Sequence, residues 1–145
     1  MAETLGSLCD KLTIVKLKQW HTAEPGRLES LAGQERQLSG EIDQFVSDAA
    51  SGRLPAERLT FAANKVYKEE GNAVPAVGGD IGTVFAHLAE VNCKLWHEVE
   101  KGYEIDKVPV GERDGLIKQL AVLNLERNKC IDSIDRQFRH LIAGR

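Results

Sequence analysis

Several features that would narrow the class of this protein are missing from its 145 residues. No run of about 18 apolar residues is present, which argues against a membrane-spanning helix. The three cysteines are far apart and lack C-x-x-C spacing, so Cys9, Cys93 and Cys130 are expected to be buried, reduced thiols and no metal site is predicted. No segment shows sustained alternation of apolar and polar residues, so no β-strand is expected.

An excess of charge of one sign is also missing. The formal net charge is −3 and the isoelectric point is near 5.8, which argues against a broad nucleic-acid-binding surface but leaves room for a small basic pocket. The acidic N-terminus, residues 1–4, is unlike a secretory signal. Hydrophobic residues make up 42% of the chain, an ordinary share for a folded protein. We therefore expect a single cytoplasmic domain over residues 1–145, with no cofactor and no membrane span.

What the sequence does contain is helical periodicity. Apolar residues recur at alternating steps of three and four, the spacing of one buried helix face. The helices expected from this pattern cover about 3–22, 27–50, 55–70, 81–103 and the segment after a linker at 106–111. The fold predicted is all-α: an elongated, largely up-down bundle of about five helices, with heptad patterning in the second, fourth and fifth. Predicted end signals are Thr4 or Glu3, Gly52, Pro55 and Asp80.

The first predicted helix is apolar on two sides. One row is Leu5, Leu8, Leu12 and Val15, widened by Cys9 and Trp20, and the other is Asp10, Ile14, Leu17 and His21. A helix of this kind is either central in a bundle or covered by a second subunit. We expect a homodimer buried along the first or second helix.

The last predicted helix carries an informative interruption. Its core row reads Ile117, Leu120, Asn124, Arg127, Ile131, Ile134, Phe138 and Leu141. An amide and a guanidinium stand where leucines would pack, and burying them without partners is costly. Arg127 must therefore meet a carboxylate or a bound anion. Asp10 is the first choice among carboxylates, with Glu90 and Glu98 as alternatives.

The fourth and fifth predicted helices are expected to form an antiparallel hairpin. Pairing Val99 with Ile117 puts Asn92 beside Asn124. Two facing amides in one core layer could exchange hydrogen bonds and fix the register of the helices.

The candidate functional residues form one set on three helices. They are Asp10, Lys11, Lys18 and His21; Asn92 and Trp96; and Asn124, Arg127 and Asn128. In one interpretation they line a polar pocket, where Arg127 holds an anionic group, the asparagines bind hydroxyls or amides, and Trp96 is an apolar platform. In the other they are a buried structural network. His87, His97 and His140 show no mutual ligand spacing, and Gly78-Gly79-Asp80 is read as a turn and cap.

Two stretches carry a resemblance to a known family. They are Leu5-Gly6-Ser7-Leu8-Cys9-Asp10-Lys11-Leu12-Thr13-Ile14 with Leu17-Lys18 and His21, and Leu123-Asn124, Arg127-Asn128 and Ile131-Asp132 through Asp135. They resemble the ends of small helical bacterial proteins of unknown function. The resemblance implies an all-α cytoplasmic protein, sometimes associated with polysaccharide biosynthesis, and supplies no reaction.

Two functions are therefore expected from the sequence. The first is a helical interaction or structural module that acts as a homo-oligomer or with a protein partner. The alternative is a protein, enzymatic or not, that binds a sugar phosphate or nucleotide-like anion in an interhelical polar pocket.

Overall fold

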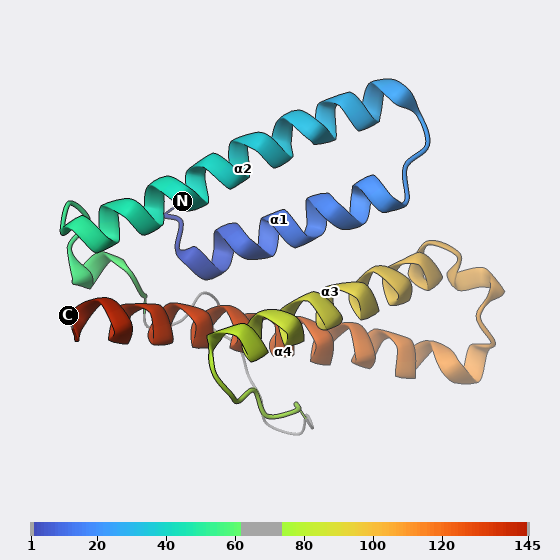
Figure 1. The fold of residues 1–145 in the computed structure, drawn as a ribbon. Helices are drawn as coiled ribbons and strands as arrows, with labels where there is room; N and C mark the ends of the chain where they lie inside the picture. Colours follow the sequence, from blue (N-terminus) through green and yellow to red (C-terminus); the bar gives the residue numbers. More distant parts are fainter. Residues whose placement is uncertain (1, 62–73, 145) are drawn as a thin grey trace.

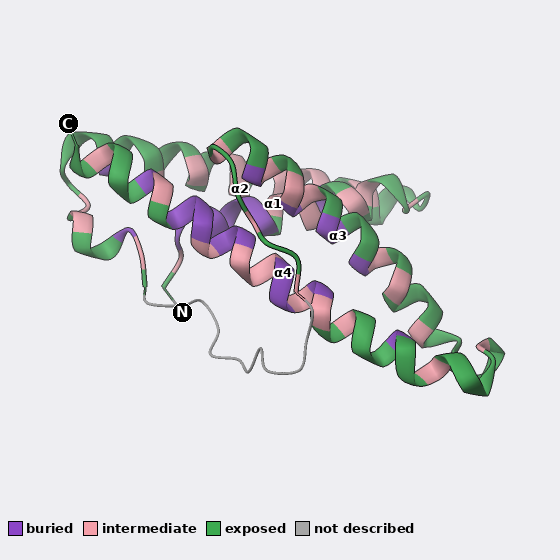
Figure 2. Ribbon diagram, turned by 90° about the horizontal axis from the view of Figure 1, so that it is seen from below, coloured by how far each residue is buried: buried purple, intermediate pink, exposed green. Residues whose placement is uncertain are grey.

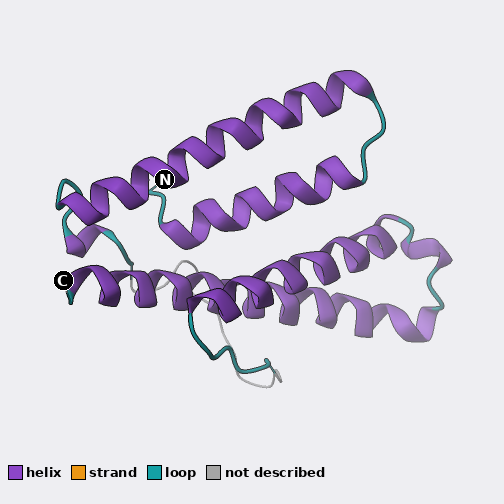
Figure 3. Cartoon of the chain, viewed as in Figure 1, coloured by secondary structure: helices purple, strands orange, loops and turns teal. Residues whose placement is uncertain are grey.

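The computed structural model describes residues 2–61 and 74–144. Over these residues the chain forms four α-helices: α1 (Leu5–Trp20), α2 (Pro25–Ser51), α3 (Ile81–Tyr103) and α4 (Val110–Ala143). Two short 3-10 helices, η1 (Ala56–Arg58) and η2 (Ile105–Lys107), complete the secondary structure. The described ranges contain no strand, as Figure 3 shows, so the all-α prediction is confirmed. No helix within them has the length and apolar character needed to cross a membrane.

The helices form two hairpins that pack together (Figure 1). One hairpin joins α1 to α2, and the other is the predicted antiparallel pair of α3 and α4. Helix α1 packs against α2 on one side and against α3 and α4 on the other. This central position explains why α1 is apolar on two sides without a second subunit.

The helix ends follow the predicted signals closely. The Thr4 hydroxyl accepts a hydrogen bond from the Ser7 N–H, and the Ser7 hydroxyl accepts one from the Thr4 N–H at 2.8 Å, which makes a capping box for α1. Gly52 ends α2 in the left-handed conformation, with φ at 81°. Asp80 occupies the N-cap position of α3, although its side chain makes no capping bond. Pro55 leads only into the single turn of η1, and residues 59–61 are not helical, so the start of the predicted third helix is wrong. The remainder of that prediction, residues 62–70, lies outside the described residues.

The core is concentrated at one end of the molecule (Figure 2). The main cluster joins the starts of α1 and α3, the end of α2, the C-cap of η1 and the second half of α4: Leu5, Cys9, Ala49, Leu59, Val84, Leu88, Cys130, Ile131, Ile134 and Phe138. A smaller cluster of Val91, Leu95 and Leu123 lies between α3 and α4. Beyond it, both helices of this hairpin are largely exposed.

The predicted core row of α4 is wrong at both ends. Ile117 is 62% exposed and Leu141 is 59% exposed, whereas Leu116 and Leu123 are buried. A strict seven-residue repeat drifts by about 20° per heptad on a straight helix, so over 34 residues the row leaves the contact face. The predicted core residues Trp20 and Val99 are also exposed, because they lie near the ends of α1 and α3.

The cysteines divide into two classes, which corrects the expectation that all three are buried. Cys9 and Cys130 are buried and Cys93 is exposed. Burial, together with the nearby charges of Asp135 and Asp10, raises the pKa of the Cys9 thiol to about 12. Burial likewise raises the pKa of the Cys130 thiol to about 12, with added contributions from the charges of Glu126 and Asp10.

Thiol labelling should reveal this division. We expect the folded protein at pH 8 to react rapidly with one equivalent of a thiol reagent, at Cys93, because the thiolate is the reacting form and buried thiols stay protonated. Urea should expose the other two. Replacement of Cys93 by serine is the control and should abolish the rapid phase. Rapid labelling of two or three thiols in the folded state would contradict the burial of Cys9 and Cys130.

Candidate functional site

An ion pair between α1 and α4 lies at the centre of the predicted cluster. Arg127 Nε donates to both carboxylate oxygens of Asp10, at 3.1 and 3.2 Å, and Arg127 Nη2 donates to Asp10 Oδ2 at 2.8 Å. Asp10 is 4% exposed. The predicted partner of Arg127 is therefore confirmed, whereas the alternatives Glu90 and Glu98 pair with lysines on their own helix.

Helix α3 joins this pair through a fully buried asparagine. Asn92 Nδ2 donates to Asp10 Oδ1 at 2.9 Å and to Thr13 Oγ1 at 2.7 Å, and the Thr13 hydroxyl donates to the Asp10 carbonyl. Because the Asp10 carboxylate and the Thr13 hydroxyl both accept from Asn92, the NH₂ end of its amide must face α1. Its Oδ1 is left buried with no hydrogen-bond donor among the described residues. An unsatisfied buried acceptor of this kind is uncommon in native proteins.

The predicted exchange of hydrogen bonds between two asparagine amides is wrong. Both donor hydrogens of Asn92 go to α1, and no hydrogen bond joins it to Asn124 in the part of the chain that the structure describes. Asn124 nonetheless lines the same pocket as Asn92. The Asn92 N–H groups face α1 rather than Asn124 because a carboxylate is a stronger acceptor than a neutral amide.

The first of two pockets beside Arg127 lies between α1 and α2, and we name it the basic pocket. Its volume is about 430 Å³. It is lined by Asp10, Lys11, Ile14, Val15, Lys18, Gln34, Gln37, Leu38 and Arg127. Cations and amides on its walls offer hydrogen-bond donors to an acidic or hydroxylated group.

The second pocket lies between α1 and the α3–α4 hairpin, and we name it the apolar pocket. Its volume is also about 430 Å³. It is lined by Ile14, Asn92, Leu95, Trp96, Val99, Glu100, Tyr103, Asn124 and Arg127. Apolar and aromatic walls with a few convergent polar groups are typical of small-molecule sites of this size.

The charges around the basic pocket are only partly compensated. Lys11 forms an ion pair with Glu3. Burial acts to raise the pKa of the Glu3 carboxyl, but hydrogen bonds from Lys11 and Ser7 outweigh this effect and lower the pKa. Lys18 has no ion-pair partner within residues 2–61 and 74–144. Arg127 is 34% exposed, and its Nη1 amino group has no partner there either. Lys18 and the free edge of Arg127 are therefore the groups best placed to attract an anion.

The structure brings most of the predicted site residues together. Asp10, Lys11 and Lys18 line the basic pocket, Asn92, Trp96 and Asn124 line the apolar pocket, and Arg127 lines both. His21 joins them indirectly, because its ring stacks on Trp96 with centroids 4.7 Å apart. Asn128 lines neither pocket, since its side chain donates back to the Asn124 carbonyl at 2.8 Å.

Sequence reasoning missed residues in two places. Glu126 is buried and its carboxylate lies 2.5 Å from Nε2 of His87, and neither residue was among the candidates. Gln34 and Gln37 line the basic pocket, but nothing in their spacing could reveal this, because the pocket depends on how α2 lies against α1. The sequence did offer one signal for Glu126, which is a charged residue directly beside Arg127 in the last predicted helix.

Outside comparisons add no constraint on this site. A search against protein-family models, curated proteins and solved structures finds no match to this chain. The family resemblance of its termini therefore stays a prediction. Among the described residues, no group of three or more histidine, cysteine, aspartate or glutamate side chains is arranged to hold a metal ion.

Proposed function

We propose that this protein binds a small organic anion beside Arg127. The observation that carries the proposal is that Arg127 is held by Asp10 and lines two pockets. Both sequence interpretations are thus combined. The ion pair provides the structural network, and the same network positions a guanidinium for a ligand.

Thermal denaturation tests this proposal. A ligand that binds only the folded state raises the melting temperature, and the rise grows with the logarithm of the ratio of its concentration to its Kd. We expect phosphate esters, at millimolar concentration and low salt, to raise the melting temperature of the wild-type protein by a few degrees. Lys18→Gln should reduce this rise.

The matched control for Lys18→Gln is Lys16→Gln. Lys16 is on the same helix and pairs with Glu35 at 3.0 Å, but it does not line the basic pocket. The control should respond to phosphate esters as the wild type does. Equal losses in the two variants would mean that net charge, rather than the pocket, binds the anion.

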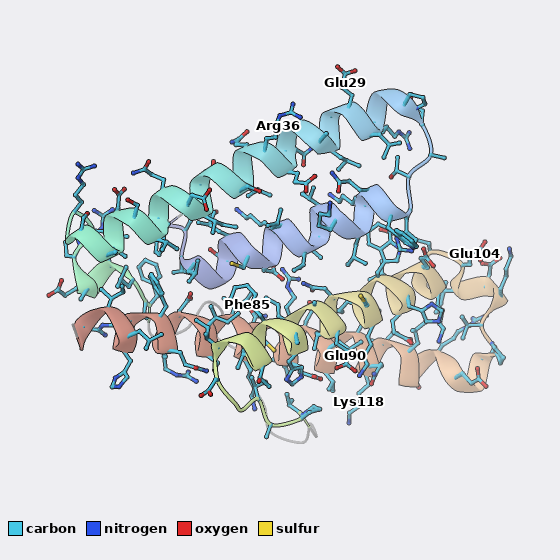
Figure 4. The ribbon with its side chains drawn as sticks, viewed as in Figure 1. Glu29, Arg36, Phe85, Glu90, Glu104 and Lys118 are labelled. Carbon is cyan, nitrogen blue, oxygen red and sulfur yellow. The ribbon has the colours of Figure 1, made fainter. Side chains whose placement is uncertain are left out.

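A second candidate function is that of a cytoplasmic homo-oligomeric interaction module. It is favoured by exposed apolar side chains near the connection of α3 and α4, including Tyr103 at 83%, Val110 at 76% and Ile117 at 62%. The outer surface of α2 is less suitable, because Glu29 and Arg36 point away from α1 there (Figure 4). Exposed apolar side chains mark interaction sites in many proteins where they gather into one patch.

Sedimentation velocity tests the oligomer. If the hairpin end holds two copies together, the wild type should sediment as a dimer at about 100 µM, and Ile117→Lys should dissociate it, because a charge placed in an apolar interface is costly to bury. The control is Lys118→Gln at the neighbouring position. A wild-type protein that stays monomeric throughout would overturn this second candidate and leave the ligand site unaffected.

A further inference from the structure

We infer that the ligand has two parts, an anionic group in the basic pocket and a flat ring in the apolar pocket, joined across Arg127. This inference rests on the proposed function and deepens it by naming the ligand class. The class is a ring-bearing phosphate ester of about the size of a nucleoside monophosphate.

The two pockets adjoin each other. Ile14 of α1 and Arg127 of α4 line both of them, so these two side chains form the shared wall. The hydrogen bonds that Arg127 donates to Asp10 hold the guanidinium at this wall, and Nη1 takes no part in them. A ligand that reaches from one pocket to the other must therefore pass Ile14 and Arg127.

The pockets differ in the chemistry that they can bind. The basic pocket offers Lys18, Arg127 and the amides of Gln34 and Gln37, which suit a phosphate with several acceptor oxygens. The apolar pocket has Glu100 on its wall, and this carboxylate repels a second anion there. The charged end of the ligand is thereby directed to the α1–α2 side.

The apolar pocket suits a ring with a polar edge. Trp96 and Tyr103 supply aromatic surface, and Ile14 and Leu95 add aliphatic surface. Asn92 Oδ1 is a buried acceptor without a donor, and the Asn124 amide makes no side-chain hydrogen bond to another described residue. A ring that carries an N–H or O–H group beside a carbonyl would satisfy both amides. A pyrimidine base has that pattern of donor and acceptors.

Calorimetric titration with three probes tests the inference: inorganic phosphate, uridine and uridine monophosphate. Joining two bound parts makes the second binding step intramolecular, so the monophosphate should bind at least about tenfold more tightly than either part alone. Lys18→Gln should weaken the binding of the monophosphate and of phosphate by about fivefold or more and leave the binding of uridine unchanged. Trp96→Leu should weaken the binding of the monophosphate and of uridine by a similar factor and leave the binding of phosphate unchanged. Lys16→Gln is the control and should alter none of the three.

The outcomes separate this inference from the proposed function. If the monophosphate binds no more tightly than phosphate, or responds to only one of the two variants, the two-part ligand is overturned while anion binding stands. If none of the three probes binds at millimolar concentration, both proposals fail. A circular dichroism melt of each variant shows whether it is folded, and Trp96→Phe replaces Trp96→Leu if the latter is not.

Discussion

Arg127→Met is expected to lower the free energy of unfolding by about 3 kcal/mol, the low end of the range for breaking a buried ion pair. The change keeps much of the side-chain length and removes the charge, so Asp10, which is only 4% exposed, loses its counter-ion. The low end applies because a third of the Arg127 side chain is in solvent. Urea denaturation measures the loss directly.

The second half of this experiment is Asp10→Asn in the Arg127→Met background. It removes the buried charge that the first change leaves unpaired, and we expect it to restore part of the lost stability. If the two changes are strictly additive, the bidentate contact does not hold α1 against α4, and the ion pair would be incidental to the fold.

Gly6→Ala is expected to destabilise the protein by about 1–3 kcal/mol, even though alanine is the better helix former. A Cβ added at Gly6 would lie 2.7 Å from the Ile131 carbonyl oxygen, closer than atoms can approach, so α1 and α4 would have to separate. Separation would also strain the hydrogen bond from the Gly6 N–H to Asp135 Oδ1, which measures 2.7 Å. Thermal or urea denaturation measures the loss.

Gly40→Ala makes the same chemical change on α2 and is the matched control. A Cβ there meets nothing within 4 Å, and the position is exposed, so the substitution should stabilise the protein by up to about 1 kcal/mol. Opposite signs for the two variants are the expected result. A Gly6→Ala protein as stable as Gly40→Ala would contradict the close packing of α1 on α4.

Local signals made much of the fold predictable. Thr4 marks the start of α1 because its side chain caps a free backbone N–H, and Gly52 marks the end of α2 because glycine readily adopts the left-handed conformation. Neither reason depends on the rest of the chain. The pairing of Arg127 with Asp10 was also predictable, since a guanidinium in an apolar row needs an anion and Asp10 stood in the apolar row of another helix.

Features that depend on the relative placement of helices were not predictable. Ile117 and Leu141 are exposed because the heptad row drifts off the contact face of the 34-residue α4, and periodicity alone does not reveal which part of the row stays on that face. The orientation of the Asn92 amide follows from Thr13, a residue with no outstanding feature in the sequence. Gln34 and Gln37 join the site only because of the angle between α1 and α2.

The central claim is that a ring-bearing phosphate ester fills the two pockets on either side of Arg127. The chain has two tryptophans, which give two indole N–H signals in a nitrogen–proton correlation spectrum. Trp96 lines the apolar pocket and its Nε1–H donates to Glu100 at 2.8 Å, whereas Trp20 is 86% exposed and lines neither pocket. On titration with uridine monophosphate, the Trp96 signal should shift and saturate while the Trp20 signal stays in place. A Trp96 signal that does not move, or that moves only as much as that of Trp20, would contradict the claim.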